Sequence, residues 1–182
     1  ERVARRLQIF IPLKLAIIFV LFYFTFRSIA QTLMVMLGVP LSLVGGVWLM
    51  VFLDYNMSIA VWVGIIALAG VAAETSAVML AYLNEACKRR KATGQLDSLP
   101  DLLDTVHQGA LERIRPMAMA GLANIIGLLP IMWATGTGAD VMKRIAAPLV
   151  GGMITAPLLS LIVIPVIYAW WQEKNLPADQ PA

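Results

Sequence analysis

The chain has 182 residues, of which 60% are hydrophobic and 14% are charged. A soluble domain carries about 25% charged residues, so this composition, with a mean hydropathy of +0.80, excludes a soluble domain. The single cysteine, Cys87, excludes an internal disulfide and a thiol-rich metal site. There is also no phosphate-binding glycine loop and no nucleophile–base arrangement. We therefore expect an all-α membrane protein that is not an enzyme.

Five apolar segments each approach or exceed the roughly 20 residues that a helix needs to cross a bilayer. They are Gln8–Phe26, Ile29–Leu53, Met57–Leu83, Pro116–Ala134 and Ile145–Trp171. This pattern predicts a bundle of five transmembrane helices in four parts. Residues 1–83 hold the first three, 84–115 form a cytoplasmic linker with an amphipathic helix, 116–171 hold the last two, and 172–182 form a cytoplasmic tail.

The first segment follows three arginines, Arg2, Arg5 and Arg6, and no small-residue cleavage site accompanies it. It therefore lacks the features of a signal peptide. The sequence starts at Glu1 rather than at methionine, and five spans place the two termini on opposite sides of the membrane. Together these features predict a piece of a larger protein.

The third segment carries a single acidic residue, Glu74, within the stretch GIIALAGVAAETSAVMLAY. An ionised carboxylate in hydrocarbon costs about 3 kcal/mol or more, so such an acid usually faces a protein interior or a water-filled path. Two interpretations remain open: a residue of a proton pathway, and a protonated acid hydrogen-bonded to a neighbouring helix. Because the chain shows no means of using ATP, the acid favours protons as the energy source of a transporter.

Residues 84–115 form the only long polar segment and begin with a KRRK cluster. Anionic lipid and nucleic acid are alternative partners for this cluster, but a juxtamembrane anchor is favoured and no nucleic-acid partner is expected. Ser98, with Asp101 three residues later, predicts a helix start. Apolar residues at helical spacing then predict an amphipathic helix lying at the interface. The excess of Lys and Arg places this linker and the C-terminus in the cytoplasm.

Most of the ten methionines lie in plain apolar runs, where thioethers serve as packing groups. Met142 differs because it lies in the polar turn GTGADVMKR at the entrance of the fifth segment. Thioethers prefer Cu(I) and similar soft ions. A thioether at Met142 could therefore be reached from water, so metal binding and packing both stay open for this residue.

Two long stretches and one short motif resemble a known family. They are VPLSLVGGVWLMVFLDYNMSIAVWVGIIALAGVAAE, GLLPIMWATGTGADVMKRIAAPLVGGMITAPLLSLIVIP and the pair Arg115-Pro116. They closely resemble the C-terminal membrane half of heavy-metal efflux pumps of the resistance-nodulation-division (RND) superfamily, nearest to the copper/silver branch of the CusA/SilA type. The resemblance runs in order from the eighth to the twelfth transmembrane helix of that family. The family's first seven helices and both large periplasmic loops are absent from this sequence.

The resemblance implies a proton-driven homotrimer in the bacterial inner membrane. Its transported substrates would be Cu(I) and Ag(I), with no tightly bound cofactor. Its partners would be the missing N-terminal half of the pump, a periplasmic adaptor and an outer-membrane channel.

The resemblance also implies roles for individual residues. Glu74 would be the acid of a proton relay whose partner aspartate lies on the absent fourth helix. The relay lysine that follows Arg-Pro in the family is replaced here by Met117. Asn124 shares a helix face with Met117 and can hydrogen-bond a protonated acid, but it cannot replace the charge. Met142 would pair with a methionine of the fourth helix along the metal path.

Three functions therefore remain. The first is the C-terminal membrane portion of a Cu(I)/Ag(I) pump, which the retention of Glu74 and Met142 favours. The second is a truncated or split, non-transporting membrane module that assembles with another protein, which the loss of the lysine at Met117 favours. The third is a relative that exports other cargo. The resemblance of the fourth and fifth segments to the copper/silver branch opposes this function.

Overall fold

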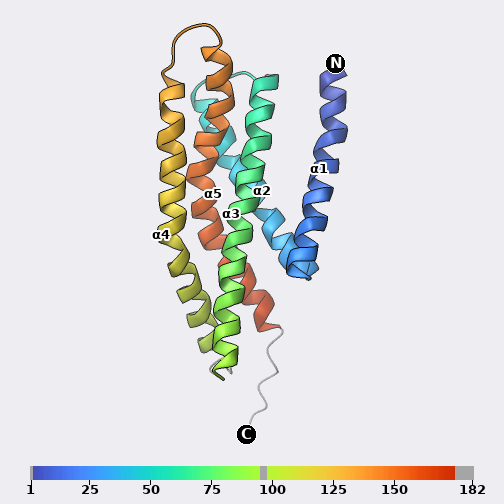
Figure 1. Cartoon of the computed structure of the whole chain (residues 1–182), viewed down its shortest axis with the longest axis vertical. Helices are drawn as coiled ribbons and strands as arrows, with labels where there is room; N and C mark the ends of the chain where they lie inside the picture. Colours follow the sequence, from blue (N-terminus) through green and yellow to red (C-terminus); the bar gives the residue numbers. More distant parts are fainter. Residues whose placement is uncertain (1, 95–97, 175–182) are drawn as a thin grey trace.

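The computed structural model describes residues 2–94 and 98–174, with side chains from Pro12 onward. Within these ranges the regular structure is helical: α1 (Arg2–Phe26), α2 (Ile29–Phe52), α3 (Ile59–Ala92), α4 (Leu99–Met132) and α5 (Ala139–Glu173). Successive helices run in opposite directions, so the first turn of α1 and the last turn of α5 lie at opposite ends (Figure 1). The predicted all-α fold is confirmed.

Four of the described helices, α2 to α5, are long and apolar enough to cross a membrane. The apolar part of α1 for which side chains are described is shorter and covers Pro12–Phe26. α1 stands apart from the other four helices over most of its length (Figure 1). Phe22 and Phe26, near its end, pack against the buried cluster of the bundle. α1 is therefore attached to the bundle mainly through its last turns.

The helix starts follow local side-chain chemistry. Ser58 caps α3 by accepting a hydrogen bond from the backbone N–H of Val61. Ser98 caps α4 by accepting one from the N–H of Asp101, which confirms the start predicted there. Gly138 precedes α5 with φ of 85°, a left-handed conformation that glycine adopts without a steric penalty.

The segment predicted as a linker is largely helical and continuous with its neighbours. Residues 84–92 extend α3, and α4 runs without a break from Leu99 through Pro116 to Met132. Leu102 and Val106 of this segment are buried in the core of the bundle. Part of the amphipathic face is thus covered within the bundle, whereas Leu99, Leu103 and Leu111 remain exposed. The location of this helix at the membrane interface stays a prediction. Of the predicted tail, residues 175–182 lie outside the described residues.

A close contact between α2 and α5 lies at the centre of the bundle. A Cβ atom on Gly45 would lie 2.6 Å from the carbonyl oxygen of Gly151, and a Cβ on Gly151 would collide with the Gly45 carbonyl. Leu68 of α3 occupies the space that side chains at Gly46 and Gly152 would need. Small residues allow membrane helices to approach this closely, so α5 packs on α2 and α3 together.

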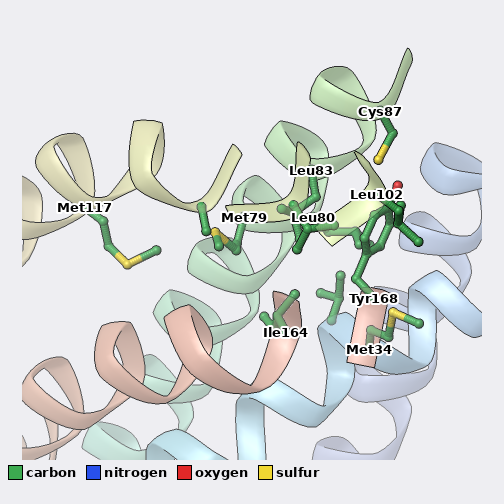
Figure 2. Close-up of a cluster of buried hydrophobic side chains, with 12 residues drawn as sticks. Met34, Met79, Leu80, Leu83, Cys87, Leu102, Met117, Ile164 and Tyr168 are labelled. Atoms are coloured by element: carbon green, nitrogen blue, oxygen red, sulfur yellow. The ribbon is translucent and has the colours of Figure 1, made fainter. Parts of the chain in front are cut away.

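A second contact region joins α2, α3 and α5 nearer the end of α5. The side-chain amides of Gln31 and Asn84 exchange hydrogen bonds of 3.0 and 3.1 Å. The Tyr168 hydroxyl donates to Asn84 Oδ1 at 2.9 Å. Around this polar clamp lies a buried apolar cluster (Figure 2): Met34, Val35, Met79, Leu80, Leu83, Cys87, Leu102, Val106, Ala110, Met117, Ile164 and Tyr168.

Gly151→Ala should force α5 away from α2, because the added methyl group meets a backbone carbonyl that cannot rotate aside. We expect a loss of about 1–3 kcal/mol in the free energy of unfolding, measured as a fall in the thermal midpoint in detergent. Gly70→Ala is the matched control, since a methyl group there meets no described atom within 4 Å. An equal fall for both variants would contradict the proposed importance of the α2–α5 contact.

Candidate functional site

The candidate site lies midway along α3, where Glu74 points away from the α2–α5 contact. The neighbouring Ala72, Ala73 and Ser76 are buried in the bundle, and the hydroxyl oxygens of Ser76 and Ser160 lie 3.4 Å apart. Because these residues face the interior of the bundle, Glu74 lies on the outer face of α3, where it is exposed. Within this chain the carboxylate therefore lies at the surface of the bundle.

A small cavity of about 90 Å³ lies beside this carboxylate, between α3, α4 and α5. We call it the Glu74 cavity. Its lining comprises Val71, Glu74, Thr75, Arg113, Met117, Ala120, Gly121, Asn124, Met153, Ala156 and Pro157. Three residues singled out in the sequence, Glu74, Met117 and Asn124, thus meet around one cavity.

Met117 and Asn124 contribute to the cavity in different ways. Met117 is 3% exposed and lies at the edge of the buried apolar cluster (Figure 2). Its side chain therefore fills space and brings no charge. Asn124 is exposed on the same face of α4, and no hydrogen bond joins it to Glu74 in the described chain. Its amide is available to a carboxylate or to water in the cavity.

Arg113 is the residue of this site that sequence reasoning missed. It is half-buried and lines the Glu74 cavity one helical turn before Met117. Its guanidinium carbon lies 5.4 Å from the ring centroid of Tyr82. In the described part of the chain, Arg113 Nε is the one buried side-chain nitrogen or oxygen without a hydrogen-bond partner. The signal was present in the spacing, because residues four apart share a helix face.

The cavity thus has an acidic side chain, Glu74, and a basic one, Arg113, that do not form an ion pair. Among the described residues, the ion pairs are Arg89–Glu85 and Arg90–Asp104, so Glu74 and Arg113 are not in direct contact. Opposite charges attract more strongly in a partly buried site than in water. The site therefore places a positive charge at the same cavity as the Glu74 carboxylate.

Met142 lies away from this cavity, in the first turn of α5. Its side chain is 51% exposed, and its backbone N–H bonds to the carbonyl of Gly138. At 1.5 Å per residue, Pro157 of the Glu74 cavity is roughly 22 Å further along α5. Among the described side chains, no three His, Cys, Asp or Glu residues gather in a way that could hold a metal. Met142 and Glu74 therefore belong to separate regions of the molecule.

Comparison with known proteins identifies similar chains among metal transporters. Residues 1–172 match the sequence profile of the AcrB/AcrD/AcrF family. The chain is 48% identical over 178 residues to the cation efflux system protein CusA of Escherichia coli, covering 96% of this chain and 17% of CusA. It is 45% identical over 170 residues to the putative cation efflux system protein SilA of Salmonella typhimurium, covering 92% of this chain and 16% of SilA.

The cobalt-zinc-cadmium resistance protein CzcA of Cupriavidus metallidurans is more distant, at 37% identity over 174 residues, with 96% of this chain and 16% of CzcA covered. A crystal structure of a heavy metal efflux pump superposes with a TM-score of 0.81 at 32% identity, over 94% of this chain and 16% of that one. The chain therefore spans less than one fifth of the length of the relatives it matches.

Proposed function

Because the chain belongs to the AcrB/AcrD/AcrF family of RND transporters, we propose that it forms the C-terminal membrane portion of a proton-driven pump for Cu(I) and Ag(I). The names of CusA and SilA support cation efflux. The resemblance of the two long sequence stretches to the copper/silver branch supports these two ions as substrates. The observation that carries proton coupling is the shared cavity of Glu74 and Arg113, halfway along apolar helices.

In this proposal Glu74 alternates between two charge states. Its protonated form is neutral and tolerable at hydrocarbon depth, whereas its ionised form requires polar partners. Arg113 supplies the positive charge across the cavity, and the Asn124 amide supplies a hydrogen-bond donor. Ionisation draws α3 and α4 together across the Glu74 cavity, and protonation releases them. This change in attraction is the event that couples proton movement to helix movement.

Met142, the assembly of the pump and its location complete the proposal. Met142 contacts the transported ion together with soft ligands from the rest of the pump, since Cu(I) needs two or three such ligands and this chain offers one at that level. The metal is cargo, and no tightly bound cofactor is involved. The assembled pump is a homotrimer of the inner membrane with a cytoplasmic C-terminus, joined by a periplasmic adaptor and an outer-membrane channel.

One observation favours a second candidate function. The family resemblance implies a lysine where this chain has Met117, and the buried thioether cannot carry charge. If Arg113 does not replace that lysine, the chain is a non-transporting membrane module that assembles with another protein. The two candidates differ in whether a pump containing this chain moves metal at all.

Glu74→Gln should abolish metal resistance in cells that express a pump containing this chain. Glutamine keeps the shape and hydrogen bonding of the side chain but cannot titrate. The measurements are growth on Cu(I) and Ag(I) together with the amount of pump in the membrane, which should not change. Resistance equal to that of the unmodified pump would remove Glu74 from the coupling mechanism.

Arg113→Met should likewise abolish export, because it removes the cation of the Glu74 cavity. The double variant Arg113→Met/Met117→Lys returns a positive charge one helical turn along the same face, and export should recover in part. The measurement is Cu(I) uptake into inverted membrane vesicles. An unmodified pump that is inactive, with activity gained in the single variant Met117→Lys, would instead support the non-transporting module.

Met142→Ile should weaken Cu(I) export by a pump containing this chain while leaving its amount in the membrane unchanged. Isoleucine keeps the apolar bulk and removes the sulfur that a soft ion binds. Metal-tolerance growth measures the effect, and Met132→Ile is a matched control on α4. Unchanged tolerance for Met142→Ile would exclude this thioether from the metal path.

A further inference from the structure

A second and larger cavity continues along the bundle from the Glu74 cavity. Its volume is about 490 Å³, and it lies between the extended ends of α3 and α4. We call it the α3–α4 groove. Its polar lining comprises Tyr82, Glu85, Arg89 and Arg90 of α3 with Thr105, Gln108 and Glu112 of α4. In the proposed orientation this end of the bundle faces the cytoplasm.

The α3–α4 groove and the Glu74 cavity follow one face of α3. Residues three or four positions apart lie on the same face of a helix, so Tyr82, Glu85 and Arg89 share one face of α3. Glu85 lies eleven positions, or about three turns, beyond Glu74 and so returns to the same side of the helix. The two cavities meet at one pair of side chains. Arg113 lines the Glu74 cavity, Tyr82 lines the groove, and the guanidinium lies 5.4 Å from the ring centroid. The pair therefore links the lining of one cavity to the lining of the other.

The charges of the groove are mostly paired. Arg89 Nε lies 3.1 Å from Glu85 Oε1. Arg90 Nη2 lies 2.6 Å from Asp104 Oδ2 and donates to Gln108 at 3.0 Å. Glu112 is exposed in the groove and has no ion-pair partner in the described part of the chain. Its carboxylate is therefore not engaged in an ion pair, and it lies one residue from Arg113.

Both cavities have room for water. A cavity needs about 10–15 Å³ of space open to the centre of a water-sized sphere to hold one water molecule. The Glu74 cavity, at about 90 Å³, and the α3–α4 groove, at about 490 Å³, each exceed that several-fold. Their linings include the carboxylate, amide and guanidinium groups that hold such waters in place. A chain of waters can thus extend from Glu74 to the end of the helices once the Arg113–Tyr82 pair separates.

We propose that the α3–α4 groove is the route by which protons leave Glu74 for the cytoplasm, with Glu112 as the receiving carboxylate and the Arg113–Tyr82 pair as the gate. This inference rests on the proposed proton-coupled function. The O–H bond of protonated Glu74 breaks, and the proton passes through water to the Glu112 carboxylate. Glu74 regains its negative charge opposite Arg113. Glu112 then releases the proton to the cytoplasm and returns to its carboxylate form.

The test uses the intact pump containing this chain, reconstituted in vesicles with a trapped pH-sensitive dye and driven by added Cu(I). Glu112→Gln should slow the proton flux by about tenfold or more, because positioned proton carriers contribute rate factors of at least that size. Glu112→Asp keeps the titratable group and should restore most of the flux. Glu173→Gln, an exposed glutamate in the last turn of α5, is the matched control and should leave the flux unchanged.

Glu74→Gln separates this inference from the proposed function. If Glu74→Gln abolishes the flux and Glu112→Gln leaves it unchanged, the groove route is overturned while proton coupling stands. If both variants leave the flux unchanged, the proposed function itself fails.

A second measurement tests the groove without relying on Glu112. In a background without other reactive thiols, Gln108→Cys should react with a membrane-impermeant thiol reagent at least about tenfold faster than Val106→Cys. Gln108 lines the groove, whereas Val106 lies on α4 outside the groove lining and is 5% exposed. The reagent should reach Gln108→Cys from the cytoplasmic side. Equally slow reaction at both positions would show that the groove is closed to water and would overturn the proposal.

Discussion

The contact of α5 with α2 and α3 through glycine is the constraint on which the rest of the structure depends. At Gly45 and Gly151 the two backbones meet with no room for a side chain, and Leu68 of α3 fills the space beside Gly46 and Gly152. Lipid tails are as apolar as leucine, so helices in a membrane associate through such packing and not through a hydrophobic driving force. This contact sets the rotation of α3, because Gly64, Leu68 and Ser76 must all face α2 and α5.

The rotation of α3 has a direct consequence for its opposite face. Glu74, Tyr82 and Glu85 are turned outward, and the Glu74 cavity and the α3–α4 groove follow this line toward the end of the helices. An ionised carboxylate facing hydrocarbon is costly, so this face requires protein or water over it. The chain spans less than one fifth of the length of its relatives. The part of this line around Glu74 is therefore where we expect the rest of the pump to pack, whereas the α3–α4 groove beyond it meets water.

The sequence predicted the elements whose signal is local. Hydropathy located α2 to α5, the spacing of Ser98 and Asp101 located the start of α4, and helical periodicity placed Met117 and Asn124 on one face. Hydropathy could not show where α3 and α4 end, because a hydrogen-bonded helix does not stop where its side chains become polar. Arg113 was therefore counted among the charges of a linker, although it lines the Glu74 cavity.

Contacts between distant segments could not be predicted from the sequence for a different reason. The hydrogen bonds among Gln31, Asn84 and Tyr168 join three helices, and no periodicity within one helix records which partner it faces. The same applies to the Arg113–Tyr82 pair, whose members lie on α4 and α3.

The replacement of a lysine by Met117 acquires a physical meaning from these positions. Moving the cation from position 117 to Arg113 shifts it four residues, or roughly 6 Å, along the axis of α4. At 117 a positive charge would lie in the lining of the Glu74 cavity, on the same face of α4 as Asn124. At Arg113 it lies instead where that cavity and the α3–α4 groove meet, against the ring of Tyr82. Attraction between Glu74 and Arg113 is then present only after the proton has left, so protonation of Glu74 removes the force that holds the guanidinium in the Glu74 cavity. In this arrangement one residue both stabilises the charged acid and controls the path by which its proton leaves.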